Sequence, residues 1–172
     1  MIETKRLVLE PLTATHADLL FEPLQDRRIY HWISVVPPAR IEELRTRWGS
    51  LARSGDQGPL SLGWAVKRRA DGLYVGKCDA EVTAGIATNV GYLIFPGCWN
   101  QGYATELLHA LVATLAQHSV TELHAFVTAG NRASERVLLK GGFHKARLIP
   151  DADTIRGVRH DDVEYVSFGA KT

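Results

Sequence analysis

The stretch "NQGYATE", residues 100–106, places one glycine directly before a run that predicts the first turn of a helix. From Tyr103 to His118 the apolar residues recur three and four positions apart, which indicates a long amphipathic helix. The preceding stretch "NVGYLIF", residues 89–95, is typical of a strand. Because Gly102 has no Cβ and the first N–H groups of a helix have no partner within it, this turn predicts a seat for an anion such as phosphate.

Two well-known phosphate loops are excluded by counting along the chain. A P-loop requires G-x-x-x-x-G-K-[ST], and no such Lys follows Gly97 or Gly102. A dinucleotide fingerprint requires a small residue where Leu107 stands and an acid at the end of the next strand, whereas Glu122 stands at the start of that strand. The alternative interpretation, that Gly102 only tightens a strand-to-helix turn, stays open.

The remaining chain alternates between strand and helix patterns, without repeats or a linker. Strands are predicted at 6–12, 60–68, 74–82, 89–95, 122–128 and 160–169, and helices at 13–24, 41–51, 103–118 and 131–140, with turns at 53–59 and a loop at 150–162. This order predicts an α+β fold, with a mixed, mostly antiparallel central sheet flanked by about four helices.

Length and charge limit the class of protein. A chain of 172 residues with 45% apolar content fits a single domain spanning 1–172. Twenty basic and nineteen acidic side chains leave a net charge of +1 without a charged block, which argues against nucleic acid and membrane partners. The N-terminal stretch lacks a signal-peptide core, so a cytoplasmic protein is expected. Cys78 and Cys98 are expected to be buried thiols, and no metal site is expected.

A second motif follows about thirty residues after the glycine. The stretch "VTAGNRASERVLLKGGF", residues 127–143, puts Asn131 and Ser134 at a helix start and ends the helix in Gly-Gly-Phe. Together the two motifs resemble the GNAT superfamily of acyl-CoA-dependent N-acetyltransferases, and the segments 2–20 and 157–168 look like the ends of its RimJ/RimL-like branch. The resemblance implies a sheet splayed between its fourth and fifth strands, acetyl-CoA as cosubstrate, and direct acetyl transfer to a primary amine.

The resemblance also implies roles for individual residues. The backbone of Leu93, Ile94 and Phe95 would pair with the pantetheine arm, and an N–H near Ile94 would donate to the oxyanion. The pyrophosphate would take donors from Gln101, Gly102, Tyr103 and Ala104, with the Thr105 hydroxyl in addition. Asn131 would bind the pantetheine amides or cap its own helix, and both roles are compatible.

This sequence departs from the family pattern at two places. Trp99 stands where many relatives have Gln or Arg, so phosphate binding would depend more on backbone donors. Many relatives carry a Tyr in the short helix as the acid for the departing thiolate, whereas Val137 and Leu138 occupy the nearby positions. Ser134 therefore becomes the candidate acid, with a purely cofactor-binding role as the alternative.

The sequence constrains the general base and the amine acceptor less than it constrains the acetyl-CoA site. Asp79, Glu81 and His124 are candidate bases on strand faces near the splay, and a water chain is an alternative. The acceptor groove would be lined by the link 27–38 and the loop 150–162, with Tyr30, His31, Trp32, Phe126 and Thr128 as candidate acceptor-binding residues.

Three functions stay open at this point. A protein N-terminal amine acetyltransferase predicts an open groove, a small-molecule amine acetyltransferase predicts a closed acidic pocket, and a non-catalytic acyl-CoA-binding module predicts binding without transfer. Dimers are common in the family that the chain resembles, so a homodimer is also left open.

Overall fold

The computed structural model describes residues 1–51 and 60–168. Within that part of the chain, eight strands form one sheet in the order β1-β2-β3-β4-β5-β6-β8-β7. The strands are β1 (Ile2–Glu3), β2 (Leu7–Pro11), β3 (Leu60–Arg68), β4 (Tyr74–Thr83), β5 (Ile86–Ile94), β6 (Glu122–Thr128), β7 (His144–Ile155) and β8 (Val158–Phe168). The helices are α1 (His16–Leu20), α2 (Ile41–Leu51), α3 (Tyr103–Gln117) and α4 (Arg132–Lys140), with short 3₁₀ helices η1 (Pro23–Gln25), η2 (Arg27–Trp32) and η3 (Pro96–Cys98). The predicted α+β fold is confirmed.

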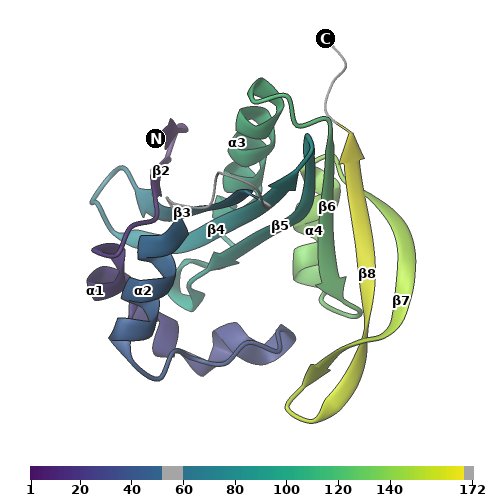
Figure 1. Ribbon diagram of the computed structural model, residues 1–172, viewed down its shortest axis with the longest axis horizontal. Coiled ribbons are helices and arrows are strands. Elements are labelled where there is room, and N and C mark those ends of the chain that lie inside the picture. The colour runs from purple at the N-terminus through teal and green to yellow at the C-terminus, as the bar shows by residue number, and fades with distance from the viewer. Residues whose placement is uncertain (52–59, 169–172) are drawn as a thin grey trace.

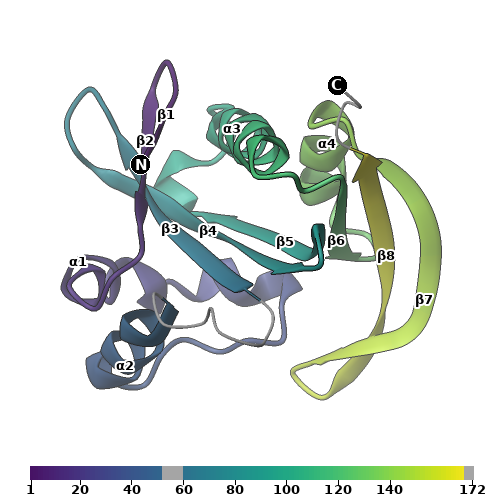
Figure 2. The same cartoon turned by 45° about the horizontal axis from the view of Figure 1, so that its top comes forward.

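The helices cover both faces of the sheet. In Figures 1 and 2, α1 and α2 lie on one face and α3 and α4 on the other. Each face has its own apolar cluster, one joining α3 to β2–β6 and the other joining α1, α2 and η2 to the opposite face. The sheet is therefore the middle layer of three.

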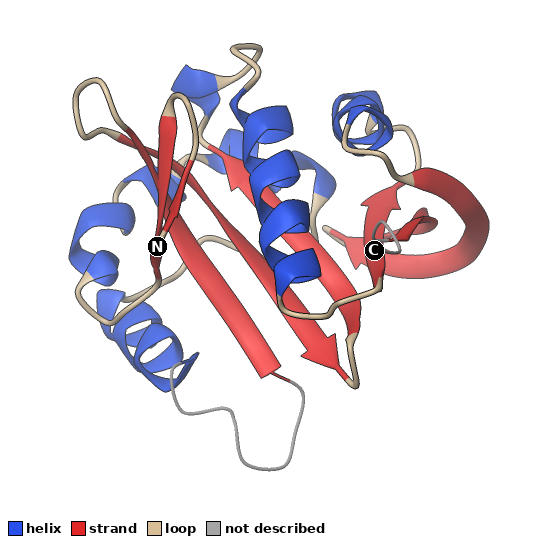
Figure 3. Cartoon of the chain, turned by 90° about the horizontal axis from the view of Figure 1, so that it is seen from above, coloured by secondary structure: helices blue, strands red, loops and turns tan. Residues whose placement is uncertain are grey.

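The apolar spacing predicted for α3 is what fixes it to the sheet. Leu107, Leu108, Leu111 and Leu115 are all at most 1% exposed, and each buried leucine contributes about 2 kcal/mol. Figure 3 shows α3 crossing the sheet along the direction of its central strands. This burial holds the N-terminal end of the helix in a fixed place beside the end of β5.

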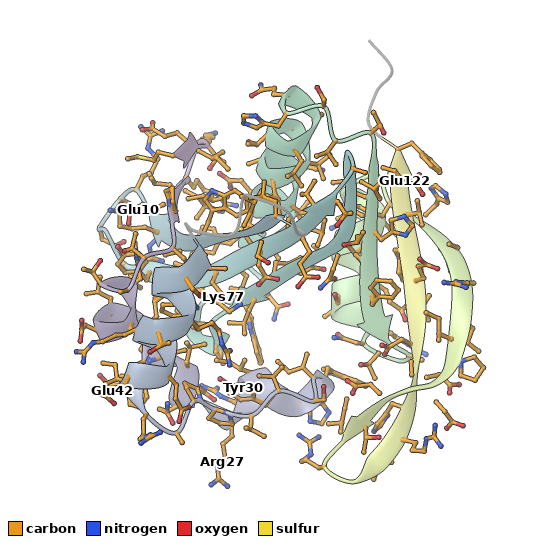
Figure 4. The ribbon with its side chains drawn as sticks, in the orientation of Figure 1. Glu10, Arg27, Tyr30, Glu42, Lys77 and Glu122 are labelled. Atoms are coloured by element: carbon orange, nitrogen blue, oxygen red, sulfur yellow. The ribbon has the colours of Figure 1, made fainter. Side chains whose placement is uncertain are left out.

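The sheet parts between β5 and β6. These parallel strands pair only through Ile86 with Glu122 and Ala87 with Leu123, so Glu122 marks the closed end of the gap in Figure 4. Beyond Ala87 the two strands diverge, as Figure 1 shows. Counted without the two-residue β1, these are the fourth and fifth strands, between which the splay is predicted.

The predicted loop at 150–162 is wrong. In the structure β7 runs on to Ile155, and a two-residue turn leads into β8 at Val158. The pairing of β7 with β8 is irregular between Ile149 and Asp153, and an edge strand with such an irregularity tolerates Pro150. The segment that reads as a loop is therefore the end of a long hairpin.

The first two helices are linked by structure that the sequence patterns miss. Residues 27–32 form η2, whose start is capped by Asp26 accepting from Arg28 N. Helix α1 is shorter than the predicted 13–24, and Thr15 makes no side-chain cap hydrogen bond. The turn predicted at 53–59 lies outside the described residues.

Candidate active site

The edge of β5 directs backbone groups at the gap. Phe95 N donates to Val75 O at 2.8 Å, and because successive residues of an antiparallel ladder point their N–H groups to opposite sides, the N–H of Ile94 points toward β6. The indole N–H of Trp99 donates to Ile94 O at 2.6 Å. A Cβ on Gly76 would collide with the backbone of Leu93 and Ile94. The neighbouring strand thus packs against the Leu93–Ile94 peptide, which is predicted as the oxyanion donor, and Trp99 holds the peptide that follows it.

A cavity of about 850 Å³ lies against this edge and takes its lining from both faces of the sheet. From the predicted sets it is lined by Leu93, Ile94, Gly102, Tyr103, Ala104, Thr105, Asn131, Ser134, His31 and Trp32. Phe95, Gln101, Tyr30, Phe126, Thr128, Asp79 and Glu81 are not among its lining residues. Arg28, Tyr92, Cys98, Arg136 and Lys140 also line it and were not predicted. The two motifs found in the sequence therefore meet at one site.

The start of α3 forms one wall of the cavity. Gly102 has φ +80° and stands at the N-cap of α3, where no side chain caps the helix. The backbone N–H groups of Tyr103, Ala104 and Thr105 are thus left for a ligand, at the positive end of a 15-residue helix. An L-residue at Gly102 would be strained, which explains why glycine stands there.

The charges of the lining fit the phosphates of a coenzyme A thioester. Arg28, Arg136 and Lys140 are its cationic residues, and none of the lining residues that the structure describes is Asp or Glu. Arg136 and Lys140 lie four residues apart on α4 and so share one face of the helix. Helix α4 therefore places two cations in the cavity lining, where Trp99 offers none.

A salt-bridged brace holds the glycine loop from behind. Glu106 accepts from Arg6 Nε at 2.6 Å, from Arg6 N at 2.8 Å and from Thr4 Oγ1 at 2.6 Å. Arg6 Nη1 also donates to Gln101 O at 2.9 Å, and its guanidinium lies 4.6 Å from the centre of the Tyr103 ring. Burial alone would raise the pKa of Glu106, but the hydrogen bonds from Thr4 and Arg6 outweigh it and lower the pKa. The brace positions Gln101 although its side chain does not line the cavity.

We expect Glu106→Ala to lower the free energy of unfolding by about 1–2 kcal/mol at neutral pH, because it removes a partly buried acceptor of several charged or polar donors. Because the folded state lowers the pKa of Glu106, the stabilisation is fully present above the ordinary pKa of 4.5. It is lost as the pH falls through the lower pKa of the folded state. Urea unfolding between pH 7 and pH 3 measures it. Glu42→Ala, an exposed first-turn glutamate of α2, is the matched control, and an equal loss there would contradict a specific role for the brace.

Ser134 meets a second hydroxyl in the cavity wall. Its backbone N–H donates to Asn131 Oδ1 at 3.3 Å, so Asn131 caps α4 as one of its predicted roles. The Ser134 hydroxyl lies 2.8 Å from Tyr92 Oη of β5. The residue pattern could not reveal this contact because the two positions are 42 residues apart.

Asp79 and Glu81 lie on β4, one strand away from the gap. Asp79 accepts from Lys77 Nζ at 2.9 Å, and a Cβ on its register partner Gly91 would come within 2.7 Å of Asp79 Oδ2. The carboxylate therefore leans over β5, the strand that borders the gap. Glu81 is exposed and pairs in register with Asn89, nearer the closed end of the gap. Of the two predicted bases on β4, the structure brings only Asp79 over β5.

His124 and Asp162 lie on the far side of the gap. Both ring nitrogens of His124 are engaged, at 2.8 Å from Glu164 Oε1 and 2.9 Å from Glu122 Oε1, so neither is left for the amine. Asp162 pairs in register with Thr128. Its Oδ1 is buried without a hydrogen-bond partner among the described residues, and burial raises the pKa of this carboxyl. Asp162 is thus a second carboxyl with the environment of a proton acceptor.

Helix η2 closes the cavity on the face that also carries α1 and α2. Tyr30 is 8% exposed, donates to Leu24 O at 2.7 Å and belongs to the apolar cluster there, so it packs in the core rather than in the acceptor wall. Figure 4 shows it on η2. Thr128 Oγ1 donates to Trp32 O at 3.0 Å, and Arg156 of the β7–β8 turn donates to Tyr30 O and His31 O at 2.9 and 3.0 Å. Thr128, at the end of β6, and Arg156, in the β7–β8 turn, thus hold η2 across the gap.

The cysteines are buried, as expected. Cys78 is 0% exposed, and burial raises the pKa of its thiol well above the ordinary range. Cys98 is 7% exposed and lines the cavity. Within residues 1–51 and 60–168, no group of three or more metal-ligating side chains is found, and no helix is long and apolar enough to cross a membrane.

The parted sheet, the uncapped helix start and the cationic cavity define a class of protein, an acyltransferase. A family model described as an acetyltransferase (GNAT) domain matches residues 6–144. The chain belongs to the GNAT acetyltransferases, which confirms the family predicted from the two motifs.

Individual relatives agree with this assignment. YoaA, an uncharacterized N-acetyltransferase of Bacillus subtilis, is 24% identical over 168 residues, which cover 96% of this chain and 94% of YoaA. Among solved structures, RimL, a ribosomal L7/L12 α-N-protein acetyltransferase in complex with coenzyme A, has a TM-score of 0.86 and 17% identity over 96% of this chain and 95% of its own. The microcin C7 self-immunity acetyltransferase MccE, in complex with acetyl-CoA and AMP, has a TM-score of 0.80 and 15% identity over 96% and 93%. At these identities the solved structures establish the fold.

Proposed function

We propose that this GNAT enzyme moves the acetyl group of acetyl-CoA directly to the α-amine of a polypeptide N-terminus. The observation that carries the proposal is the single cavity that joins the parted edge of β5 to the uncapped start of α3. Acetyl-CoA is the cosubstrate of the family to which the chain belongs, and RimL and MccE are solved with coenzyme A or acetyl-CoA. It supplies the activated acetyl group as a thioester.

The residues that would hold the donor lie along the length of the cavity. The N–H groups at the start of α3, with Arg136 and Lys140, would bind the phosphates, and the backbone edge at Leu93 and Ile94 would pair with the pantetheine arm. The N–H of Ile94 would donate to the carbonyl oxygen as charge develops on it, which is worth about 3 kcal/mol in comparable sites.

Two side chains would accept and donate the protons of the transfer reaction. Asp79, leaning over β5 from the acceptor face, would take the proton of the attacking amine directly or through water. Ser134, on the opposite face, would donate toward the departing sulfur. The two faces of the sheet thus separate the proton acceptor from the proton donor.

The charges of the cavity lining do not select the acceptor. Arg136 and Lys140 would be neutralised by the phosphates, and Arg28 is paired with Asp26 at 2.6 Å. The fold of RimL, which acts on a ribosomal protein N-terminus, supports a peptide acceptor and a RimJ/RimL-like branch. A cytoplasmic location and a homodimer belong to the same proposal.

A small amine is the second candidate, and the hairpin contact supports it. Arg156 ties the β7–β8 turn to η2, which would narrow the approach for an extended peptide. MccE shows that this fold also serves an antibiotic-immunity acetyltransferase.

The proposal is tested in two steps on the purified protein. Acetyl-CoA at about 100 times its dissociation constant should stabilise the fold by about 2.7 kcal/mol, measured by thermal unfolding. Release of free thiol is then followed with N-terminal peptides and with small amines at equal concentration. Faster turnover with peptides supports the proposal, and faster turnover with small amines favours the second candidate. Binding without transfer to any amine would leave a non-catalytic acyl-CoA-binding module.

A further inference from the structure

Two hydroxyl groups meet in the cavity wall where β5 faces α4. Tyr92 Oη lies 2.8 Å from Ser134 Oγ and 3.2 Å from Ser134 O. Both residues line the cavity, and both are partly buried. The phenol has one hydrogen, which it can donate to Ser134 O or to the nearer Ser134 Oγ, and Ser134 is its partner in both cases.

A serine hydroxyl is a poor proton donor when it acts alone. Once it gave its proton to a thiolate, Ser134 would be left as an alkoxide in a partly buried site. A phenol, with an ordinary pKa of about 10, is a far stronger acid than an aliphatic alcohol. Ser134 can thus serve as the donor only if a second group returns a proton to it.

We propose that Tyr92 is the positioning residue that orients the Ser134 hydroxyl and returns its proton. This inference rests on the proposed acetyl transfer. The amine nitrogen forms a bond to the acetyl carbon, and as the C–S bond breaks its electron pair stays on the sulfur. Ser134 Oγ gives its proton to that sulfur, and Tyr92 gives its phenolic proton to Ser134 Oγ. The phenolate regains a proton from the solvent, which has received the one released by the amine, so protons balance over one turnover.

Two further observations favour this pair. Burial raises the pKa of Tyr92 to about 12, which keeps the phenol protonated between turnovers and still leaves it a stronger acid than the aliphatic hydroxyl of Ser134. Val137 and Leu138 on α4 carry no hydroxyl, whereas β5 delivers one to the same wall of the cavity.

Tyr92→Phe tests the inference because it removes only the hydroxyl. We expect kcat to fall about 10-fold or more, as for a lost functional hydrogen bond, and KM for acetyl-CoA to stay within about twofold because the ring remains. In the Ser134→Ala background, Tyr92→Phe should cause no further loss. Tyr165→Phe, the same change at a tyrosine that is 3% exposed on β8, should retain the wild-type kcat. A wild-type kcat for Tyr92→Phe, or losses that multiply in the double variant, would overturn the inference.

A change of leaving group separates proton supply from a structural role. An acetyl thioester of an aromatic thiol releases a more acidic thiol that needs less help from a proton donor. The ratio of wild-type to Tyr92→Phe kcat/KM should therefore fall toward one with this donor, and an unchanged ratio would overturn the inference. If the wild-type protein transfers acetyl to no amine, the proposed function fails instead, and the two failures are distinguishable.

Discussion

Gly102→Glu should reduce the affinity for acetyl-CoA by about 100-fold or more, because it adds a side chain and a negative charge beside the N–H groups that would bind the phosphates, even though its Cβ would lie 3.4 Å from Arg6 Nη2. Two like charges about 4 Å apart repel by about 4 kcal/mol at an effective dielectric of about 20. The cavity also offers its phosphate donors around this residue, at the uncapped start of α3. The ligand-induced rise in melting temperature measures the loss, and it should nearly disappear in the variant.

The glycine's left-handed backbone requires a matched control. Any L-residue at φ +80° is strained by about 1 kcal/mol or more, so part of any effect could come from the backbone. Gly72, at φ +73° with open space around its Cβ position, lies in the β3–β4 turn outside the cavity lining. Gly72→Glu should cost similar stability and leave acetyl-CoA binding unchanged. Gly102→Asn adds a neutral side chain that tolerates this backbone, and its loss should be smaller than that of Gly102→Glu. Unchanged affinity in Gly102→Glu would contradict the phosphate assignment.

The elements that carry the donor site could be predicted from local patterns. The apolar spacing of α3, the glycine before it and the Asn-x-x-Ser start of α4 are each contained in one short segment, and each predicts its own backbone conformation. The predicted strand 122–128 agrees with β6 as the structure has it. Local patterns sufficed here because the donor site is built largely from backbone groups at the ends of regular elements.

The acceptor side could not be predicted in the same way, because its geometry depends on contacts between distant segments. Pro150 and Gly157 read as loop residues, yet β7 accommodates the proline as an edge strand. Nothing in the local sequence shows that Arg156 contacts η2, 125 residues away from His31, or that Gly91 leaves room for Asp79. Tyr92 reads as an ordinary aromatic strand residue until Ser134 is placed beside it.

Asp79→Asn should lower kcat/KM for the amine by about 100-fold at pH 7, since general-base catalysis typically contributes a factor of that order or more. The carboxylate leans over Gly91 toward the gap and is held there by Lys77, so an amide keeps the shape and loses the basicity. Gly91→Ala should mimic the loss, because a Cβ there would displace the carboxylate.

The pH dependence of the Asp79→Asn variant should also report the acceptor. A general base is needed only while the amine is protonated, so the variant should recover as the pH rises through the pKa of the free amine. An N-terminal α-amine loses its proton near pH 8, and an alkyl amine near pH 10. Recovery of the variant between about pH 8 and 9 supports a peptide acceptor, and recovery only near pH 10 supports a small alkyl amine. Glu81→Gln, on the same strand but exposed, is the matched control and should keep the wild-type rate. A wild-type rate for Asp79→Asn combined with a large loss in Asp162→Asn would contradict the role of Asp79. It would identify Asp162, whose pKa is raised by burial, as the general base instead.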